Sequence, residues 1–165
     1  MPEKETVERA KKDKREGKAP STQAGEFVHE EIEHIREGKH GARSTKQAIA
    51  IGLSKARRAG VQLAPPKKGT ASQETREKAE HDVEAGQHPK KSVSRTRSRA
   101  TRSALKREPH AAASHTALAK QARSAAKKRT AAERSASARK AAKTKGPAKR
   151  SAAARKAART RARTQ

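Results

Sequence analysis

The segment Ser44-Thr-Lys-Gln-Ala-Ile-Ala-Ile-Gly-Leu-Ser-Lys-Ala-Arg-Arg-Ala-Gly60 carries the strongest fold signal in the chain. Ser44 followed three residues later by Gln47 matches a capping box, in which two side chains satisfy free backbone donors at a helix start. Two arginines occupy the expected last turn, and Gly60 suits the position just beyond a helix end. The segment therefore predicts a helix from about residue 44 to residue 59.

The sequence before and after this segment is punctuated in the same way. Pro2 and Gly17 bracket a first predicted helix, and a second helix is expected to start after Ser21 or Thr22 and to end at Gly38. A fourth and weaker helix is predicted over about 73–85. These signals favour a small all-helical region.

The large apolar side chains are few, and the second helix places its own within one stripe at helical spacing. Glu30, Glu31, Glu33 and Arg36 are expected on the opposite side of that helix. The predicted core consists of Val7, Phe27, Val28, Ile32, Ile35, Ile49, Ile51, Leu53, Val61 and Leu63. A core of this size supports only marginal stability. A homodimer or a protein partner bound through the helical region is therefore expected.

Charge divides the chain in two. Residues 1–88 carry 18 Lys/Arg and 15 Asp/Glu, whereas residues 89–165 carry 25 Lys/Arg and only two acids, Glu108 and Glu133. The second part also repeats itself, because Arg134–Thr144 and Arg150–Thr160 differ at only two positions. Basic residues around the whole helical circumference leave no apolar stripe to pack, and like charges weaken a free helix.

The fold class predicted from these observations is mainly α. A small N-terminal region of two or three short helices (1–68) precedes a linker with room for a short helix (69–91). The rest (92–165) is expected to be a long, largely disordered Ala/Lys/Arg-rich basic tail.

A polycation with so few counter-charges is neutralised best by a polyanion, which predicts nucleic acid as the partner. Phosphate contacts carry little sequence information, so salt-sensitive, non-specific binding of duplex DNA is expected. The candidate contact residues are Arg57, Arg58, Lys67, Lys68, Arg95, Arg97, Arg99, Arg102, Arg123, Lys127, Lys128, Arg129, Arg134, Arg139, Lys140, Lys143, Arg150, Arg155, Lys156, Arg159, Arg161 and Arg163.

Several other functions lack the residues they need. Stacking platforms for single strands require aromatic side chains, and the chain has one Phe, no Tyr and no Trp. A helix-turn-helix reader built from the second and third helices remains an alternative, although their connection is longer than usual. No enzyme motif, cofactor site or membrane segment is expected. No metal site is predicted either, because His29 and His34 are five residues apart, as are His110 and His115.

The stretches Ser21–Val28 and Arg36–Gly60 resemble a family of small basic bacterial proteins catalogued as a domain of unknown function. Some members carry the label plasmid stabilization protein, which implies a role in plasmid or nucleoid maintenance and a cytoplasmic, nucleoid-associated location. The basic tail is similar in composition to bacterial histone-H1-like proteins. The competing expectation is an interaction protein, with RNA or ribosomes bound by the tail and a protein contacted by the helical module.

Overall fold

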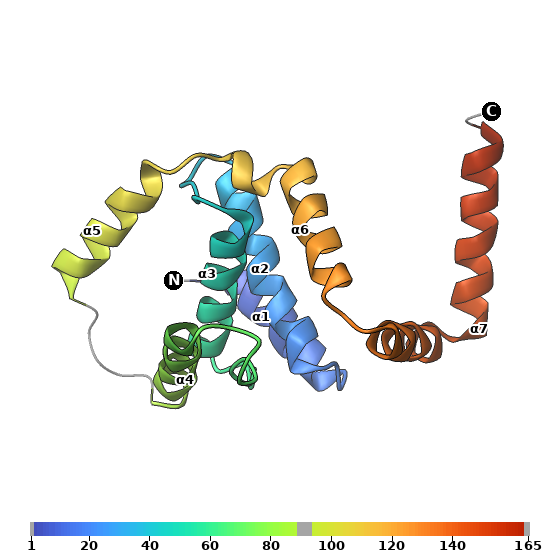
Figure 1. Ribbon diagram of the computed structural model, residues 1–165, viewed down its shortest axis with the longest axis horizontal. Helices are drawn as coiled ribbons and strands as arrows, with labels where there is room; N and C mark the ends of the chain where they lie inside the picture. The colour runs from blue at the N-terminus through green and yellow to red at the C-terminus, as the bar shows by residue number, and fades with distance from the viewer. Residues whose placement is uncertain (1, 89–93, 164–165) are drawn as a thin grey trace. The chain divides into compact units, whose positions relative to one another are not determined.

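The computed structural model describes residues 2–88 and 94–163 of the chain (Figure 1). Over these residues it forms helices and no β-sheet, with one isolated bridge between Lys68 and Ala71. The chain divides into two compact units, residues 1–121 and 122–165. The predicted mainly-α class is confirmed.

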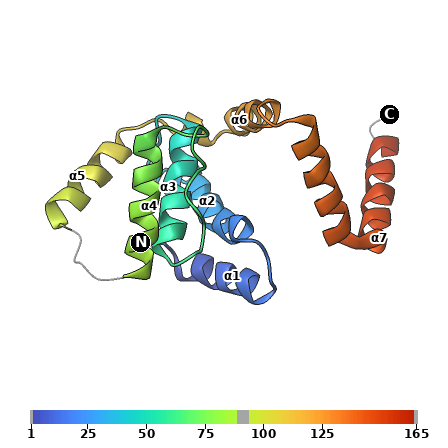
Figure 2. The same ribbon diagram turned by 60° about the horizontal axis from the view of Figure 1, so that its bottom comes forward.

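Four helices form the first part of the first unit: α1 (Lys4–Arg15), α2 (Pro20–Arg36), α3 (Thr45–Arg58) and α4 (Gln73–Gln87). Helix α2 contacts both α1 and α3, and α4 packs against α3 (Figures 1 and 2). The predicted bounds agree closely with these helices. The exception is the start of α2, which begins at Pro20 because a proline at the first helical position has no N–H to satisfy and a suitable φ.

Three glycines end the first three helices in the same way. Gly17, Gly38 and Gly60 all have positive φ, which only glycine adopts at low cost. After each of them the next N–H bonds to a carbonyl five residues back, as in Val61 N–H to Ala56 O at 3.1 Å. Each end is therefore a Schellman motif, and Val61, a predicted core residue, packs in the same cluster as Ala56 of the helix it follows.

Small residues bring α2 and α3 close together. Ala48, Gly52 and Ala56 are buried at four-residue spacing on α3, where they share one helix face. The predicted core residues Ile49 and Ile51 are only partly buried and lie outside both core clusters. That part of the prediction is wrong because the close approach of the helices leaves room for alanine and glycine, not for isoleucine.

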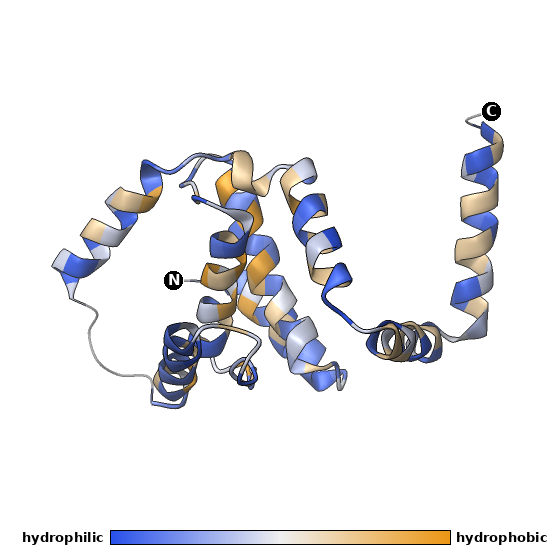
Figure 3. Ribbon diagram, in the orientation of Figure 1, coloured by the Kyte–Doolittle hydropathy of each residue, from blue (hydrophilic) through white to orange (hydrophobic). Residues whose placement is uncertain are grey.

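The core consists of two clusters, both rich in alanine. One contains Ile32 and Ile35, and the other contains Phe27 and Val61. Val7, Val28, Leu53 and Leu63, also predicted for the core, pack against the clusters while partly buried. The most apolar parts of the chain lie on α2 and α3, whereas α7 alternates hydrophilic residues with alanine (Figure 3).

A segment distant in sequence completes the first unit. The N–H groups of Gly41 and Ala42 donate to Leu105 O and Pro109 O at 2.9 and 3.0 Å. The short 3-10 helix η1 (Ala111–Ala113) follows, and Ala112 and Ala113 are buried in the cluster around Ile35. Residues 105–113 are thus docked on the α2–α3 connection.

The predicted disordered tail is wrong over the described residues. They form α5 (Arg95–Lys106), α6 (His115–Lys127) and α7 (Ala131–Arg163), with a bend in α7 at Gly146. The predicted linker–tail boundary at residues 91–92 lies outside the part of the chain that the structure describes.

Local chemistry explains why these segments are helical with little core contact beyond Leu118 of α6, which packs against the cluster around Ile35. Alanine, lysine and arginine are among the best helix formers, so propensity outweighs the repulsion between like charges. Each helix also has an N-cap. Ser94 and Ser114 accept from N–H groups three residues on, and Thr130 and Glu133 form a reciprocal capping box.

Candidate nucleic-acid interface

The predicted contact residues beyond residue 94 are all exposed, and they stand on or beside three helices. Four of them lie on α5, and Arg123 and Lys127 lie on α6. Lys128 and Arg129 occupy the connection to α7. Five further exposed cations share these segments and were missing from the prediction, although the same composition signal covers them: Lys106, Arg107, Lys120, Lys145 and Lys149.

Helix α7 carries the largest number of cations among the described helices, with twelve Lys/Arg and one acid, Glu133. Its two sequence repeats have matching structures on either side of Gly146, which has φ +67°. Thr144 and Thr160 occupy the same position in the two repeats, and their hydroxyls donate to Lys140 O and Lys156 O at 2.9 and 3.0 Å.

The cations of each repeat concentrate on one side of the helix. At about 100° per residue, Arg155, Lys156, Arg159 and Arg163 fall within an arc of about 100°. The arc is repeated in the first half of α7 by Arg139, Lys140 and Lys143. Arg150 and Arg161 stand on the other side among alanines. A strong cationic face with a weaker second face therefore recurs along the helix.

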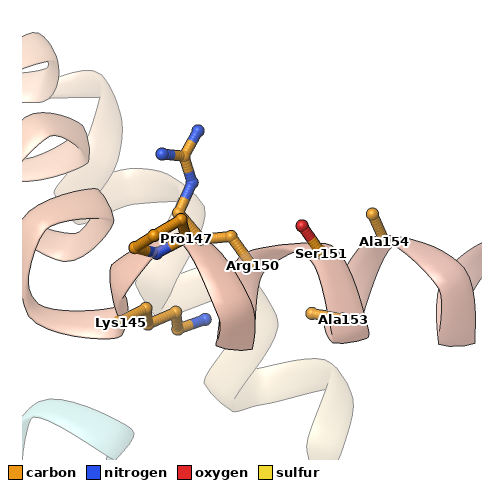
Figure 4. A pocket seen from close by; sticks show the side chains of 6 residues that line it. All are labelled: Lys145, Pro147, Arg150, Ser151, Ala153 and Ala154. Carbon is orange, nitrogen blue, oxygen red and sulfur yellow. The ribbon is translucent and has the colours of Figure 1, made fainter.

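An open hollow lies beside the bend of α7 (Figure 4). It is lined by Lys145, Pro147, Arg150, Ser151, Ala153 and Ala154. Two of these side chains are cationic, and none is a carboxylate or an imidazole. Its chemistry suits an anion.

Two arginines at the start of α7 form hydrogen bonds within the chain. The guanidinium of Arg129 donates to Glu133 O at 3.3 Å and to the hydroxyl of Ser137, and Arg134 donates to Arg129 O at 2.7 Å. These bonds close the first turn of the helix. Both side chains remain exposed.

Arg57 and Arg58 are placed differently from the tail cations. Arg57 is only 7% exposed, and its guanidinium donates to Leu63 O and Ala64 O at 3.2 and 3.5 Å. Burial lowers the pKa of this guanidinium, against the opposing charge of Asp82. The Arg58 Nε lies 2.6 Å from the buried Oδ1 of Asp82 on α4. Both arginines thus hold α3 to its neighbours, whereas the predicted contacts Lys67 and Lys68 are exposed.

Two further polar residues of α3, Gln47 and Lys55, are also engaged within the fold, whereas Lys46 is exposed. Gln47 accepts from the N–H of Arg43 at 2.8 Å, so it caps α3. Lys55 Nζ lies 2.6 Å from Glu31 Oε2 and 3.2 Å from Glu30 Oε1. This arrangement leaves α3 few free polar side chains to read bases.

Glu30 and Glu31 are buried, contrary to the prediction that they face outward. Burial alone would raise the pKa of Glu30. Hydrogen bonds from the N–H of Glu3 and from Thr6, together with the Lys55 charge, nevertheless bring that pKa below its usual value. The prediction missed this charged interior because the partners of the two carboxylates come from three separate segments. The spacing of Glu31 from Phe27 and Ile35 already places it on the apolar side of α2.

Comparison with known proteins bears on the first three helices. The model of a family of unknown function, DUF6496, matches residues 3–68, which include α1, α2 and α3. The predicted resemblance to a family of unknown function is confirmed over that range. No curated protein and no solved structure is significantly similar to the chain. Among the described residues, no helix combines the length and apolarity that crossing a bilayer requires.

Proposed function

We propose that this protein binds nucleic acid, with duplex DNA as the preferred form, through the exposed cations of α5, α6 and α7. The observation that carries the proposal is the pair of matching cationic repeats in α7, in which every Lys and Arg side chain is exposed. Two acids cannot neutralise 25 basic residues in this part of the sequence, so an external polyanion is the natural counter-charge.

A helical polycation suits the major groove of a duplex. The groove is about 12 Å wide and an α-helix is about 10–12 Å across, so a helix fits between the phosphate rims. Cations on one face, with Arg150 and Arg161 on the other, can then reach phosphates on both sides. The alanines between them are small and let the helix backbone approach the groove closely.

Binding of this kind has little sequence preference. Lysine and arginine contacts to phosphate set position, whereas contacts to base edges set specificity. The repeats provide many cations and no aromatic side chain for stacking. A histone-like role in plasmid or nucleoid maintenance is the biological process we propose, with the α1–α4 region as a module for protein contact.

The experiment is a titration of the full chain with duplex DNA, single-stranded DNA and RNA from about 50 to 200 mM salt, the range over which multi-phosphate binding weakens by orders of magnitude. A steep negative slope of log K against log salt, with duplex preferred and scrambled sequences equivalent, supports the proposal. Preference for RNA supports the alternative of an RNA- or ribosome-associated interaction protein. A shallow slope for all three contradicts binding by the tail cations.

A further inference from the structure

Three potential ligands meet at the end of α2, outside the proposed nucleic-acid interface. Glu31 and His34 lie one turn apart on α2, and His40 follows in the connection to α3. One ligand atom from each residue lies within 4.8 Å of the other two. The Glu31 side chain is fully buried, and the two histidine side chains are 13% and 16% exposed.

The orientation of His40 points one ring nitrogen at Glu31. His40 Nδ1 lies 3.1 Å from Gly41 O, and a carbonyl can only accept, so Nδ1 carries the hydrogen. His40 Nε2 then faces Glu31 Oε1 at 3.3 Å. In metal-binding histidines one ring nitrogen commonly donates to a backbone carbonyl, which leaves the other nitrogen free for the metal. His40 has that arrangement, and its free nitrogen shares its side of the ring with the Glu31 carboxylate.

The second oxygen of the Glu31 carboxylate, Oε2, is held by Lys55. Lys55 Nζ lies 2.6 Å from Oε2, yet neither oxygen accepts a hydrogen bond of good geometry from the described residues. Lys55 therefore leaves Oε1 directed toward the histidines. Carboxylates that bind metals commonly have such an outer partner on the second oxygen. Lys55 balances the charge of this buried carboxylate, but Oε1 near the two imidazoles still lacks a hydrogen-bond partner, which is costly until a donor or a cation reaches it.

We propose that Glu31, His34 and His40 bind a divalent transition-metal ion, with Zn²⁺ as the ion that this donor set favours. Two imidazoles and one carboxylate are common zinc ligands, and hard cations such as Mg²⁺ prefer oxygen alone. Glu3 Oε1 lies 2.8 Å from His34 Nε2 and accepts from Lys39 Nζ at 3.3 Å, so it becomes a further oxygen ligand only by giving up that lysine.

The position of the site gives the ion a structural role. His40 directly precedes Gly41 and Ala42, whose N–H groups hold the docked segment 105–113. An ion fixing His40 to α2 fixes that connection as well. An unfolded chain does not preform such a site, so metal binding adds to the free energy of unfolding. This addition matters here because the alanine-rich core is small.

The test is a titration of the full chain, without nucleic acid, with Zn²⁺ alone, following heat of binding and the midpoint of thermal unfolding. We expect one ion per chain and a higher midpoint with Zn²⁺. His34→Gln and His40→Gln should each weaken binding by at least about tenfold, a loss that even outer partners of a metal site can cause. His29→Gln is the matched control, because His29 is exposed on the same helix.

A second readout keeps the proposal decidable if one variant fails to fold. Co²⁺ bound to the unmodified chain should show the visible absorption of low-coordinate nitrogen–oxygen ligation, and Zn²⁺ should displace it. Absence of a one-to-one site overturns the proposal. So does equal affinity of the His40→Gln and His29→Gln chains, which would assign the binding to other histidines.

Discussion

Gly52 of α3 lies so close to α2 that a Cβ at residue 52 would be 2.7 Å from the Cα of Val28. No real Cβ packs at that distance, so the two helices can touch only through a glycine. The relationship explains why Ile49 and Ile51 are displaced from the core and why Ala48 and Ala56 enter it.

Gly52→Ala should therefore destabilise the first unit. Overpacking at a helix contact costs about 1–3 kcal/mol, which outweighs the helix-propensity gain of up to about 1 kcal/mol. Gly25→Ala is the control, because a Cβ at Gly25 on α2 meets nothing within 4 Å and should stabilise the chain slightly. Urea unfolding measures both. If Gly52→Ala is as stable as Gly25→Ala, the close contact of the helices is wrong.

Arg57 should matter for stability and not for nucleic-acid binding. Arg57→Ala removes two bonds from a buried guanidinium to the backbone carbonyls of Leu63 and Ala64, and a hydrogen bond to a charged group contributes about 1.5–3 kcal/mol. Lys67→Ala, at an exposed position nearby, is the control and should leave stability unchanged. Denaturant unfolding and DNA titration of folded variants separate the two properties. Loss of DNA affinity in folded Arg57→Ala would indicate that α3 contacts the ligand.

The buried Glu30 should make stability fall in acid. Its folded pKa lies below the ordinary value of 4.5, so the ionised form is favoured by folding. Its contribution is fully present above pH 4.5 and is lost as the pH falls below that value through the folded pKa. Unfolding followed at a series of pH values should show a flatter acid limb for Glu30→Gln. Glu8→Gln, at an exposed position on α1, should keep the unmodified profile.

Helical structure in α7 should contribute to binding beyond its charge. Ala157→Pro keeps every cation but removes a helix hydrogen bond and introduces a steric clash, at a cost of about 3 kcal/mol. We expect weaker DNA binding and loss of helical chemical shifts around residue 157. Ala157→Gly, which costs about 1 kcal/mol, should have a smaller effect. Equal affinities for all three chains would mean that charge alone determines binding.

The sequence predicts the first unit well where local chemistry decides. Gly17, Gly38 and Gly60 end their helices because a residue with positive φ is needed there. The position of a glycine in the sequence is enough to predict such a helix end. Ser44 does the same for the start of α3. Helix ends are determined by interactions among residues close together in sequence, so one sequence is enough to locate them.

Prediction fails where partners come from distant segments or where two local effects compete. Glu31 stands four residues from both Phe27 and Ile35, so helical spacing places it among the apolar side chains, and only its charge argued for an outward position. Lys55 and His40, which come from other segments, are the partners that its burial requires. The sequence also did not show that His34 and His40 lie close together, because the turn after α2 separates them. In the tail, the prediction of disorder follows from charge repulsion, but the helix propensity of alanine and arginine is the stronger effect. The capping residues Ser94, Ser114 and Thr130 are signals of helix starts in the sequence.

The most direct test of the account removes the same charge from two places. Replacing Arg155, Lys156, Arg159 and Arg163 with Gln should weaken duplex binding and reduce the salt slope by about 2–4, since each phosphate contact contributes about 0.9. The control replaces Lys4, Lys11, Lys12 and Lys14 on α1 with Gln, an equal change in net charge at exposed positions. The account predicts that the control keeps the slope of the unmodified chain. Equal losses in both variants, or an unchanged slope in the α7 variant, would contradict it.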